Sequence, residues 1–266
     1  MIMFKKFIAF IVFSVLSTGF LSAQGFEGEI VYERTYFWVN VNQHLPYLSE
    51  EEKDRMKLTY GKKAGWSSKY KLWAKDNQTL YTYDEDQPVE SDWAWRQDEF
   101  VIFRDLNKRS TKQLIETLGR TYLIDEAATP PKWKILNEIK DVAGYICMKA
   151  ETYDSIKDQR IVAWFTDQIP VDGGPEMIFG LPGMILELNM NQGSVIITAL
   201  SVKPMKLEKG LPLPKKWKGK KIENEAFKTG LEELTEVVKY VRLFGIPDNN
   251  FKVDLTIVRG LDYYTG

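Results

Sequence analysis

Apolar and polar residues alternate along many short runs of this chain, and this period of two constrains its fold more than any other feature. In residues 28–38, GEIVYERTYFW, one face of an extended chain carries Ile30, Tyr32, Tyr36 and Trp38. Successive side chains of a strand point to opposite faces of the sheet, so this alternation is typical of a half-buried strand. Similar runs follow along the chain with few helical segments between them, which predicts a mainly antiparallel sheet.

Two segments have the pattern of helices. Ser49 stands three residues before Glu52, as in a capping box, where each side chain accepts a hydrogen bond from the other residue's backbone amide. This pair predicts a helix over residues 50–58. Apolar residues also recur at helical spacing over residues 231–241, with charged residues between them, and predict an amphipathic helix near the end of the chain.

The first residues have the order of a secretory signal peptide. Lysines at 5–6 precede a compact apolar run, 7–21, and small residues follow at 22–23. The run is shorter than the ~20 residues that span a bilayer, so export with cleavage is favoured over a membrane anchor. We predict a signal peptide over residues 1–23, cut after Ala23 or alternatively after Gln24, and a single β-rich domain over 24–266 that is periplasmic or secreted.

A glycine- and proline-rich stretch, FGLPGMILEL at 179–188, precedes one of the expected strands. Pro182 and Gly183 predict a type II turn, because proline fixes φ at the first central position and glycine tolerates the positive φ of the second. Gly180 permits a close backbone approach. We expect Phe179 and Leu181 to pack into the core beside this turn.

This stretch resembles a known family. GLPGMILEL is similar to the signature of the GLPGLI family of exported Bacteroidota proteins, with Met184 in place of leucine. Asp141–Ala150 and Val162–Gly183 resemble the other motif blocks of the family in the same order, and the resemblance is strongest over residues 133–190. It implies an exported envelope protein and transfers neither an activity nor a catalytic residue.

The fold that we expect rests on both this resemblance and the strand pattern. The order of strand, strand, proline-rich loop and strand is similar to that of the curved half-barrels of lipoprotein carriers. We therefore expect one antiparallel, strongly curved sheet with one or two short helices. Similarity of fold alone does not fix function.

Carboxylates and tryptophans are the candidate site residues. Asp167, Asp172 and Glu176 lie in a loop, with Glu187 on the next expected strand; paired carboxylates can serve as acid and base or hold a cation. Exposed aromatic side chains on a sheet can bind apolar or sugar ligands, whereas buried ones belong to the core. The candidate binding residues are Trp93, Trp95, Trp164, Asp167, Asp172 and Glu176.

Several kinds of chemistry are disfavoured. His44 is the only histidine, so the chain lacks the ligand pattern of a zinc site and the usual base for a nucleophilic Cys147. We expect Cys147 to be structural, and we expect no metal and no cofactor. The formal net charge of −1 gives no general attraction to nucleic acid.

A lysine-rich run is the exception to this charge balance. PKKWKGKK, at 214–221, surrounds Trp217 with five lysines that suit either a solvated loop or peripheral contact with an anionic membrane. The five are Lys215, Lys216, Lys218, Lys220 and Lys221.

The function expected from these features is binding. The run 194–202, SVIITALSV, is apolar on both faces, and a wide sheet would leave apolar surface that one helix cannot cover. We expect an exported, non-catalytic envelope protein that binds an apolar ligand, such as a lipid, or a protein partner. The alternative is a hydrolase that uses the carboxylates of residues 167–187. Closure of the sheet around a packed centre would leave no apolar cleft.

Overall fold

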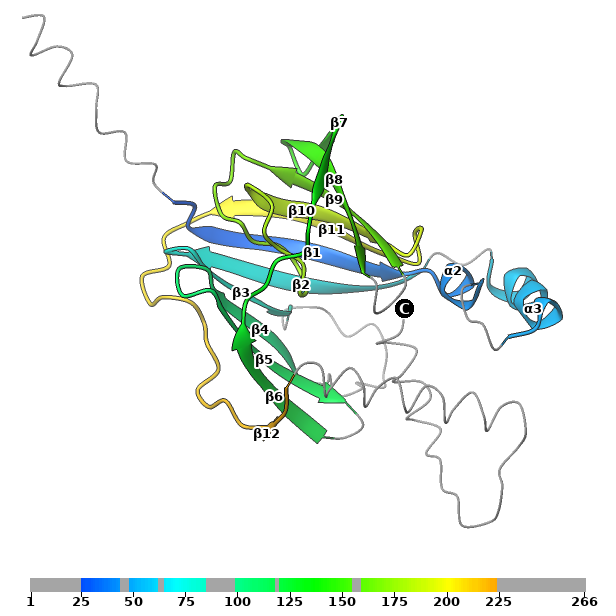
Figure 1. Ribbon diagram of the computed structural model, residues 1–266, viewed down its shortest axis with the longest axis horizontal. Helices are drawn as coiled ribbons and strands as arrows, with labels where there is room; N and C mark the ends of the chain where they lie inside the picture. Colours follow the sequence, from blue (N-terminus) through cyan, green and yellow to red (C-terminus); the bar gives the residue numbers. More distant parts are fainter. Residues whose placement is uncertain are drawn as a thin grey trace, which may run out of the picture.

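The computed structural model describes residues 25–43, 48–61, 65–84, 99–117, 120–154 and 159–223. These residues form twelve strands and two short helices (Figure 1). In chain order they are β1 Gly28–Tyr36, α2 Trp38–Gln43, α3 Glu50–Tyr60, β2 Trp66–Lys75, β3 Gln78–Tyr83, β4 Phe100–Asp105, β5 Ser110–Thr117, β6 Arg120–Ala127, β7 Lys134–Val142, β8 Tyr145–Asp154, β9 Gln159–Thr166, β10 Met184–Met190, β11 Val195–Pro204 and β12 Lys220–Lys221.

All twelve strands belong to one sheet, which is made of two meanders and the short strand β12. Its order is β12-β6-β5-β4-β3-β2-β1-β11-β10-β9-β8-β7. Strands β1 to β6 follow one another as neighbours, and so do β7 to β11; the antiparallel pair β1–β11 joins the two meanders at the middle of the sheet. The order ends at β12 on one side and at β7 on the other.

The expectation of an antiparallel, strongly curved half-barrel is wrong. The sheet is mixed, because β12 pairs parallel to β6, and it is open, because its end strands β12 and β7 do not meet. Figure 1 shows the strand direction turning gradually across the sheet, as strand twist requires. The sheet buries apolar surface without curling round on itself, because irregular segments lie against both of its faces.

The first covering segment is the β9–β10 loop, residues 167–183. It lies on the face that carries Tyr32, Tyr70 and Tyr81, which we call the inner face. The second is residues 205–223, which we call the basic strap. It runs from β11 to β12 (Figure 1), and its Leu211 and Trp217 pack on the opposite, outer face.

The alternation predicted for residues 28–38 is confirmed over β1 and fails after it. Ile30, Tyr32 and Tyr36 are buried, and the residues between the buried positions are partly exposed. Trp38, which we placed on the same strand face, instead begins helix α2. Helix α3 confirms the second local prediction: Ser49 caps it, and both hydrogen bonds of the capping box with Glu52 are present.

Other predicted segments lie outside the described residues, namely the signal peptide, the helix at 231–241 and the stretch with Trp93 and Trp95. Within the described ranges, neither helix has the length and apolar character needed to cross a bilayer.

The glycines before β10 are confirmed as conformationally special, although the turn is tighter than predicted. Gly183 has φ +136° and donates its N–H to the Leu181 carbonyl at 2.7 Å, while the Met184 N–H donates to Ile169 instead of closing a type II turn. Gly180 has φ +87°, and a Cβ there would lie 2.3 Å from Cβ of Pro130. The loop therefore approaches its neighbours too closely for larger residues.

Candidate functional site

The β9–β10 loop fills the centre of the inner face with its own apolar side chains. Ile169, Val171, Phe179 and Leu181 are buried against the sheet, which confirms the placement expected for the last two. Trp133, just before β7, donates its indole N–H to the Phe179 carbonyl at 3.0 Å. The predicted apolar cleft is therefore absent from this part of the inner face, because the chain packs its own loop there.

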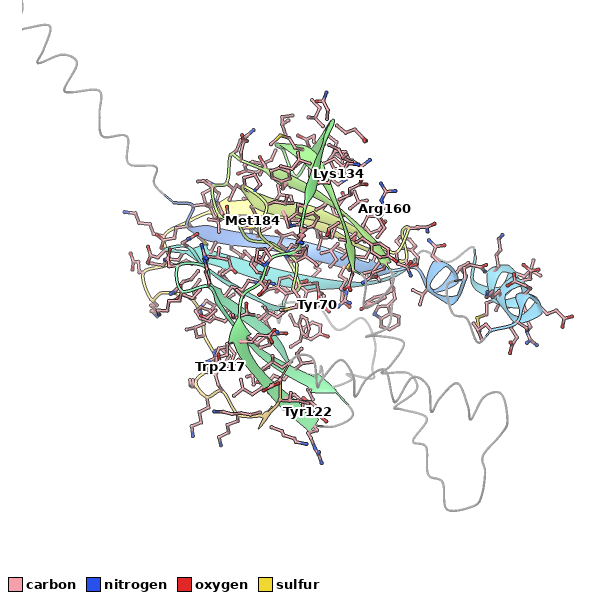
Figure 2. All side chains as sticks on the ribbon, in the orientation of Figure 1. Tyr70, Tyr122, Lys134, Arg160, Met184 and Trp217 are labelled. Carbon is pink, nitrogen blue, oxygen red and sulfur yellow. The ribbon has the colours of Figure 1, made fainter. Side chains whose placement is uncertain are left out.

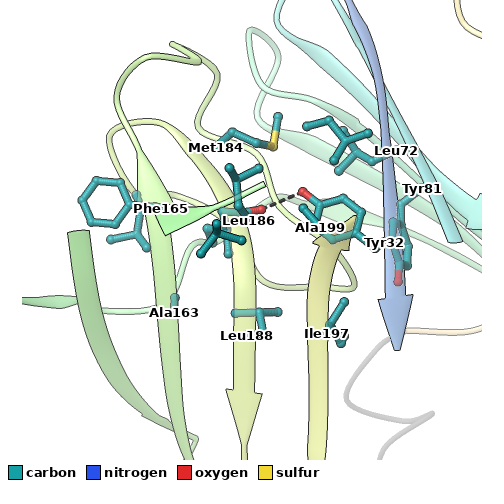
Figure 3. Packing of buried hydrophobic residues seen from close by; sticks show 14 of the residues in the cluster. Tyr32, Leu72, Tyr81, Ala163, Phe165, Met184, Leu186, Leu188, Ile197 and Ala199 are labelled. Carbon is teal, nitrogen blue, oxygen red and sulfur yellow. Dashed lines mark hydrogen bonds between the residues drawn. The ribbon is translucent and has the colours of Figure 1, made fainter. Parts of the chain in front are cut away.

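Figure 3 shows the core beneath this loop, where side chains of β1, β9, β10 and β11 meet. Tyr32 on β1 is fully buried, and its hydroxyl donates to the Ile185 carbonyl on β10 at 2.7 Å (Figure 3). Burial raises the pKa of Tyr32 far above its ordinary value, so the phenol remains a neutral donor.

Two arginines hold the loop to the sheet. Nη1 of Arg34 on β1 lies 3.0 Å from Oε1 of Glu176 in the loop. Arg104 on β4 is fully buried and donates from Nη1 to the Gly174 carbonyl at 3.1 Å and from Nη2 to the Glu176 carbonyl. The two hydrogen bonds of Arg104 are charge-assisted, and such bonds are shorter and stronger than neutral ones, so together with the Arg34–Glu176 ion pair they fix the loop at residues 174–176.

Aromatic rings surround this arginine cluster, defined as Arg34, Arg104 and Glu176. The guanidinium of Arg34 lies 4.5 Å from the ring centroid of Tyr36. Tyr70 stacks on Tyr81 with centroids 5.2 Å apart and planes at 4°. Tyr70, labelled in Figure 2, lies on β2 opposite Tyr32 of β1. Low-dielectric surroundings strengthen the attraction between the buried charges.

The environment of the cluster sets its protonation. Burial lowers the pKa of Arg104 to about 10, although Glu176 opposes this effect. Burial also lowers the pKa of Arg34, but Glu176 and the neighbouring tyrosines raise it above the usual value of arginine. Burial, followed by Glu176, raises the pKa of Tyr81. At neutral pH Arg34 and Arg104 are therefore cations, and the Tyr81 phenol is neutral.

The carboxylates that we grouped as a possible acid–base site do not come together. Asp167 and Asp172 are exposed on the loop, whereas Glu176 pairs with Arg34 on the inner face. Glu187 lies on the outer face, where it pairs with Lys140. In the parts of the chain that the structure describes, no three His, Cys, Asp or Glu side chains gather as a metal site.

Trp164, the one candidate tryptophan within the described ranges, lies on the outer face. Nζ of Lys140 is 4.6 Å and Nζ of Lys149 is 5.8 Å from its ring centroid. Both lysines also pair with carboxylates, Lys140 with Glu187 and Lys149 with Glu138. Two lysines, each paired with a carboxylate, therefore make cation–π contacts with Trp164 within the chain itself.

A site that sequence reasoning missed lies at the β7 edge. Ile135 and Ile139 on β7 are 52% and 69% exposed, and Ile146 on β8 is 53% exposed. The register places Ile135 opposite Ala150 and Ile139 opposite Met148, so the inner face continues as apolar surface to its last strand. Strand β7 is the last in the strand order, so none of the described segments pairs with its free edge.

Local signals for part of these features were present in the sequence. Arg34 occupies a buried position of the alternating run 28–36, and Arg104 occupies the same phase as Phe100 and Ile102 in β4. A charged residue in an apolar phase suggests a buried pair. No comparable pattern in the sequence indicated the β7 edge, because the order of strands in a sheet depends on pairing between segments that are distant in sequence.

Comparisons with known proteins identify one family segment. The family described as "Protein of unknown function (Porph_ging)" matches residues 151–187, which span the end of β8, β9, the β9–β10 loop and the start of β10. The segment is a small part of the chain. It overlaps the stretch in which we found the resemblance to the GLPGLI signature.

Curated relatives match only short segments. A histidine–tRNA ligase from Clostridium tetani is 43% identical over 89 residues, which are 33% of this chain and 19% of that protein. The enzyme of the same name from Clostridium acetobutylicum is 53% identical over 45 residues, or 17% of this chain and 10% of that protein. The chain thus spans a fifth or less of the length of these relatives.

Solved structures show a similar fold. Two structures of PNGF-II, in space groups P21 and C2, match with TM-scores of 0.51 and 0.52 at 16% identity. Each match covers 77% of this chain, and 33% and 32% of the respective PNGF-II chains. At this identity the likeness concerns the fold alone.

Proposed function

We propose that this chain is an exported, non-catalytic protein that binds a protein partner, and that the partner adds an extended strand to β7. The observation that carries this proposal is an open strand edge beside exposed Ile135, Ile139 and Ile146. An extended peptide binds such an edge through backbone hydrogen bonds, while alternate side chains give specificity.

The details of β7 favour a selective partner over indiscriminate pairing. Its register shifts between Leu136 and Ile139, and the strand carries Lys134 and Glu138. Bulges and charges at edge strands suppress pairing with random strands. A partner must therefore match the irregular register and place apolar side chains on the two isoleucines.

The alternatives have less support. A hydrolase needs carboxylates that act together, but Glu176 and Glu187 lie on opposite faces and each pairs with a basic residue. Binding of an apolar ligand at the centre of the inner face is disfavoured, since the β9–β10 loop occupies that surface. The short match to histidine–tRNA ligases is not extended to this chain, which spans only a small fraction of those enzymes.

Export rests on the pattern of residues 1–23, which combines lysines, an apolar run and small residues. The intact mass of the protein from the envelope fraction tests it. A mass that begins at Gln24 supports export and cleavage, whereas a chain that retains Met1–Ala23 contradicts both.

Selection of a displayed library of random peptides on the purified protein tests partner binding. We expect the selected peptides to alternate apolar residues and to protect the amides of β7 from hydrogen exchange. Ile135→Lys combined with Ile139→Lys should weaken their binding at least about tenfold, because lysine at an edge disfavours strand addition. Leu58→Lys on α3, where the leucine is 84% exposed, is the matched control and should bind as the unmodified protein does.

Three results would overturn the proposal. The library could yield no binder, the peptides could protect strands other than β7, or they could bind the double variant with unchanged affinity.

A further inference from the structure

The basic strap, residues 205–223, concentrates positive charge on a nearly neutral protein. It contains seven lysines and two glutamates, a formal charge of +5, whereas the whole chain has a formal charge of −1. The rest of the chain is therefore acidic on balance, and a partner that interacts with the strap experiences a local field unlike that of the whole molecule.

The strap is attached to the sheet at both ends. At its start, Met205 donates its N–H to the Glu27 carbonyl at 3.0 Å, and Lys75 donates to the Leu207 carbonyl at 2.7 Å. At its end, Ile222 donates to the Leu123 carbonyl at 3.1 Å, beside the short parallel pair β12–β6. The backbone is thus held in place before any ligand arrives.

Apolar anchors fix the middle of the strap on the outer face. Leu211 and Trp217 pack against a cluster of buried side chains from β3 to β6. The ring centroids of Trp217 and Phe103 are 6.5 Å apart, and Figure 2 shows Trp217 beside these strands. Because Trp217 contacts the sheet, it orients the strap and leaves the neighbouring lysines outside.

The lysines around Trp217 face solvent. Lys215, Lys216 and Lys218 in the strap are exposed, as are Lys220 and Lys221 in β12. With the residues that the structure describes, these five form no ion pair. Two apolar side chains of the strap are exposed as well, Met205 at 47% and Leu213 at 44%.

We propose that the basic strap docks the protein on an anionic lipid surface. Lysines near such a surface each contribute roughly a fivefold gain in binding, and exposed apolar side chains add affinity by entering the boundary between head groups and acyl chains. A soluble polyanion would use only the charges. The exposed Leu213, two residues before Lys215, and Met205 at the start of the strap therefore favour a lipid surface as the occupant.

This docking is independent of partner binding at β7. The strap ends in β12, and β12 and β7 are the opposite ends of the strand order. When the strap holds the protein to a membrane, the β7 edge therefore lies at the end of the sheet opposite the strap.

Co-sedimentation of the whole purified chain with vesicles tests the proposal. We expect binding to vesicles of equal parts phosphatidylcholine and phosphatidylglycerol, and much weaker binding to pure phosphatidylcholine. Lys215→Ser with Lys216→Ser should weaken binding about thirtyfold. Lys57→Ser with Lys132→Ser removes the same charge from exposed lysines outside the strap and should change binding less than about threefold.

A third variant and a competitor separate lipid docking from simple charge attraction. Leu213→Ser should weaken vesicle binding several-fold at unchanged charge, and soluble polyphosphate should compete poorly. Four results would each overturn the proposal. The two double-lysine variants could lose vesicle binding equally, or Leu213→Ser could leave it unchanged. The protein could also bind polyphosphate more strongly than vesicles, or bind no vesicles at all.

Discussion

Nη1 of Arg34 on β1 lies 3.0 Å from Oε1 of Glu176, and this ion pair joins the central strand of the sheet to the loop that lies on it. Arg104 binds the same loop through backbone carbonyls, so side-chain and main-chain contacts act at one place. The loop belongs to the segment matched by the Porph_ging family. Packing of the loop on the sheet is therefore the feature of this fold that we expect to govern its stability.

Glu176→Gln should destabilise the protein by about 3 kcal/mol, because it removes one partner of a largely buried ion pair and leaves the Arg34 charge uncompensated. Urea unfolding measures the change. Glu187→Gln is the control: its partner Lys140 is more exposed than Arg34, so we expect a cost of about 1 kcal/mol or less.

The reason for the Glu176 effect can be checked with a double variant. Arg34→Met with Glu176→Leu replaces both charges by apolar groups and should recover most of the loss. If Glu176→Gln and Glu187→Gln have the same urea midpoint, the ion pair does not hold the loop in solution.

Asp105→Asn should destabilise the β4–β5 hairpin in a pH-dependent manner. The Asp105 carboxylate accepts hydrogen bonds from the Lys108 N–H and from Nε2 of Gln78, each at 3.0 Å. Burial alone would raise the pKa of Asp105, but these hydrogen bonds and the Lys108 charge lower it below its ordinary value. A carboxyl group with a lowered pKa stabilises the fold above its unfolded pKa and loses this contribution as pH falls through its folded pKa.

We therefore expect Asp105→Asn to cost about 1.5 kcal/mol near neutral pH, and this difference should shrink below about pH 4. Urea unfolding of both proteins at neutral and acidic pH gives the comparison. A difference that grew on acidification would mean that folding raises the pKa of Asp105 instead of lowering it.

Cys147 should resist alkylation in the folded protein. The thiol is fully buried, and burial followed by the charge of Asp141 raises its pKa to about 11. Only the thiolate is nucleophilic, so near pH 8 the folded protein should react with iodoacetamide at least about a hundredfold more slowly than the protein in urea. Labelling followed by mass spectrometry measures both rates. Comparable rates would show that Cys147 is accessible, because it is the only cysteine in the chain.

The features that the sequence predicted correctly depend on neighbours along the chain. The buried phase of Ile30, Tyr32 and Tyr36 and the capping box of Ser49 and Glu52 are set within a few residues. The positive φ of Gly183 is likewise a local requirement of a tight turn. Trp38 was misplaced because only Phe37 separates the end of β1 from the start of helix α2, so the apolar run continues past the end of the strand.

The features that were not predicted depend on which distant strands meet. Glu176 and Glu187 are close in sequence, but the first lies in a loop on the inner face and the second on an outer-face position of β10. Likewise, nothing local to β12 indicates that its two residues pair parallel to β6. The open sheet, the arginine cluster and the β7 edge all follow from strand order, which alternation does not specify.

Gly183→Val should destabilise the protein far more than Ile185→Val, although both positions are buried beside the same turn. The backbone of Gly183 has φ +136°, a conformation that β-branched residues rarely adopt. In addition, a Cβ at this position would lie 2.1 Å from the Thr166 carbonyl oxygen, which belongs to the neighbouring strand and cannot rotate away. Backbone strain alone costs on the order of 1–3 kcal/mol, and the steric clash adds to it.

Ile185→Val leaves this backbone unchanged and removes one methylene from a buried side chain, for which we expect a cost of about 0.5–1.5 kcal/mol. Urea midpoints of the two variants decide the comparison. If Gly183→Val does not fold, Gly183→Ala gives a measurable intermediate, because alanine keeps the clash at Cβ but lacks the branch. Equal midpoints for Gly183→Ala and Ile185→Val would mean that residue 183 neither requires a positive φ nor approaches Thr166 as closely as the structure shows.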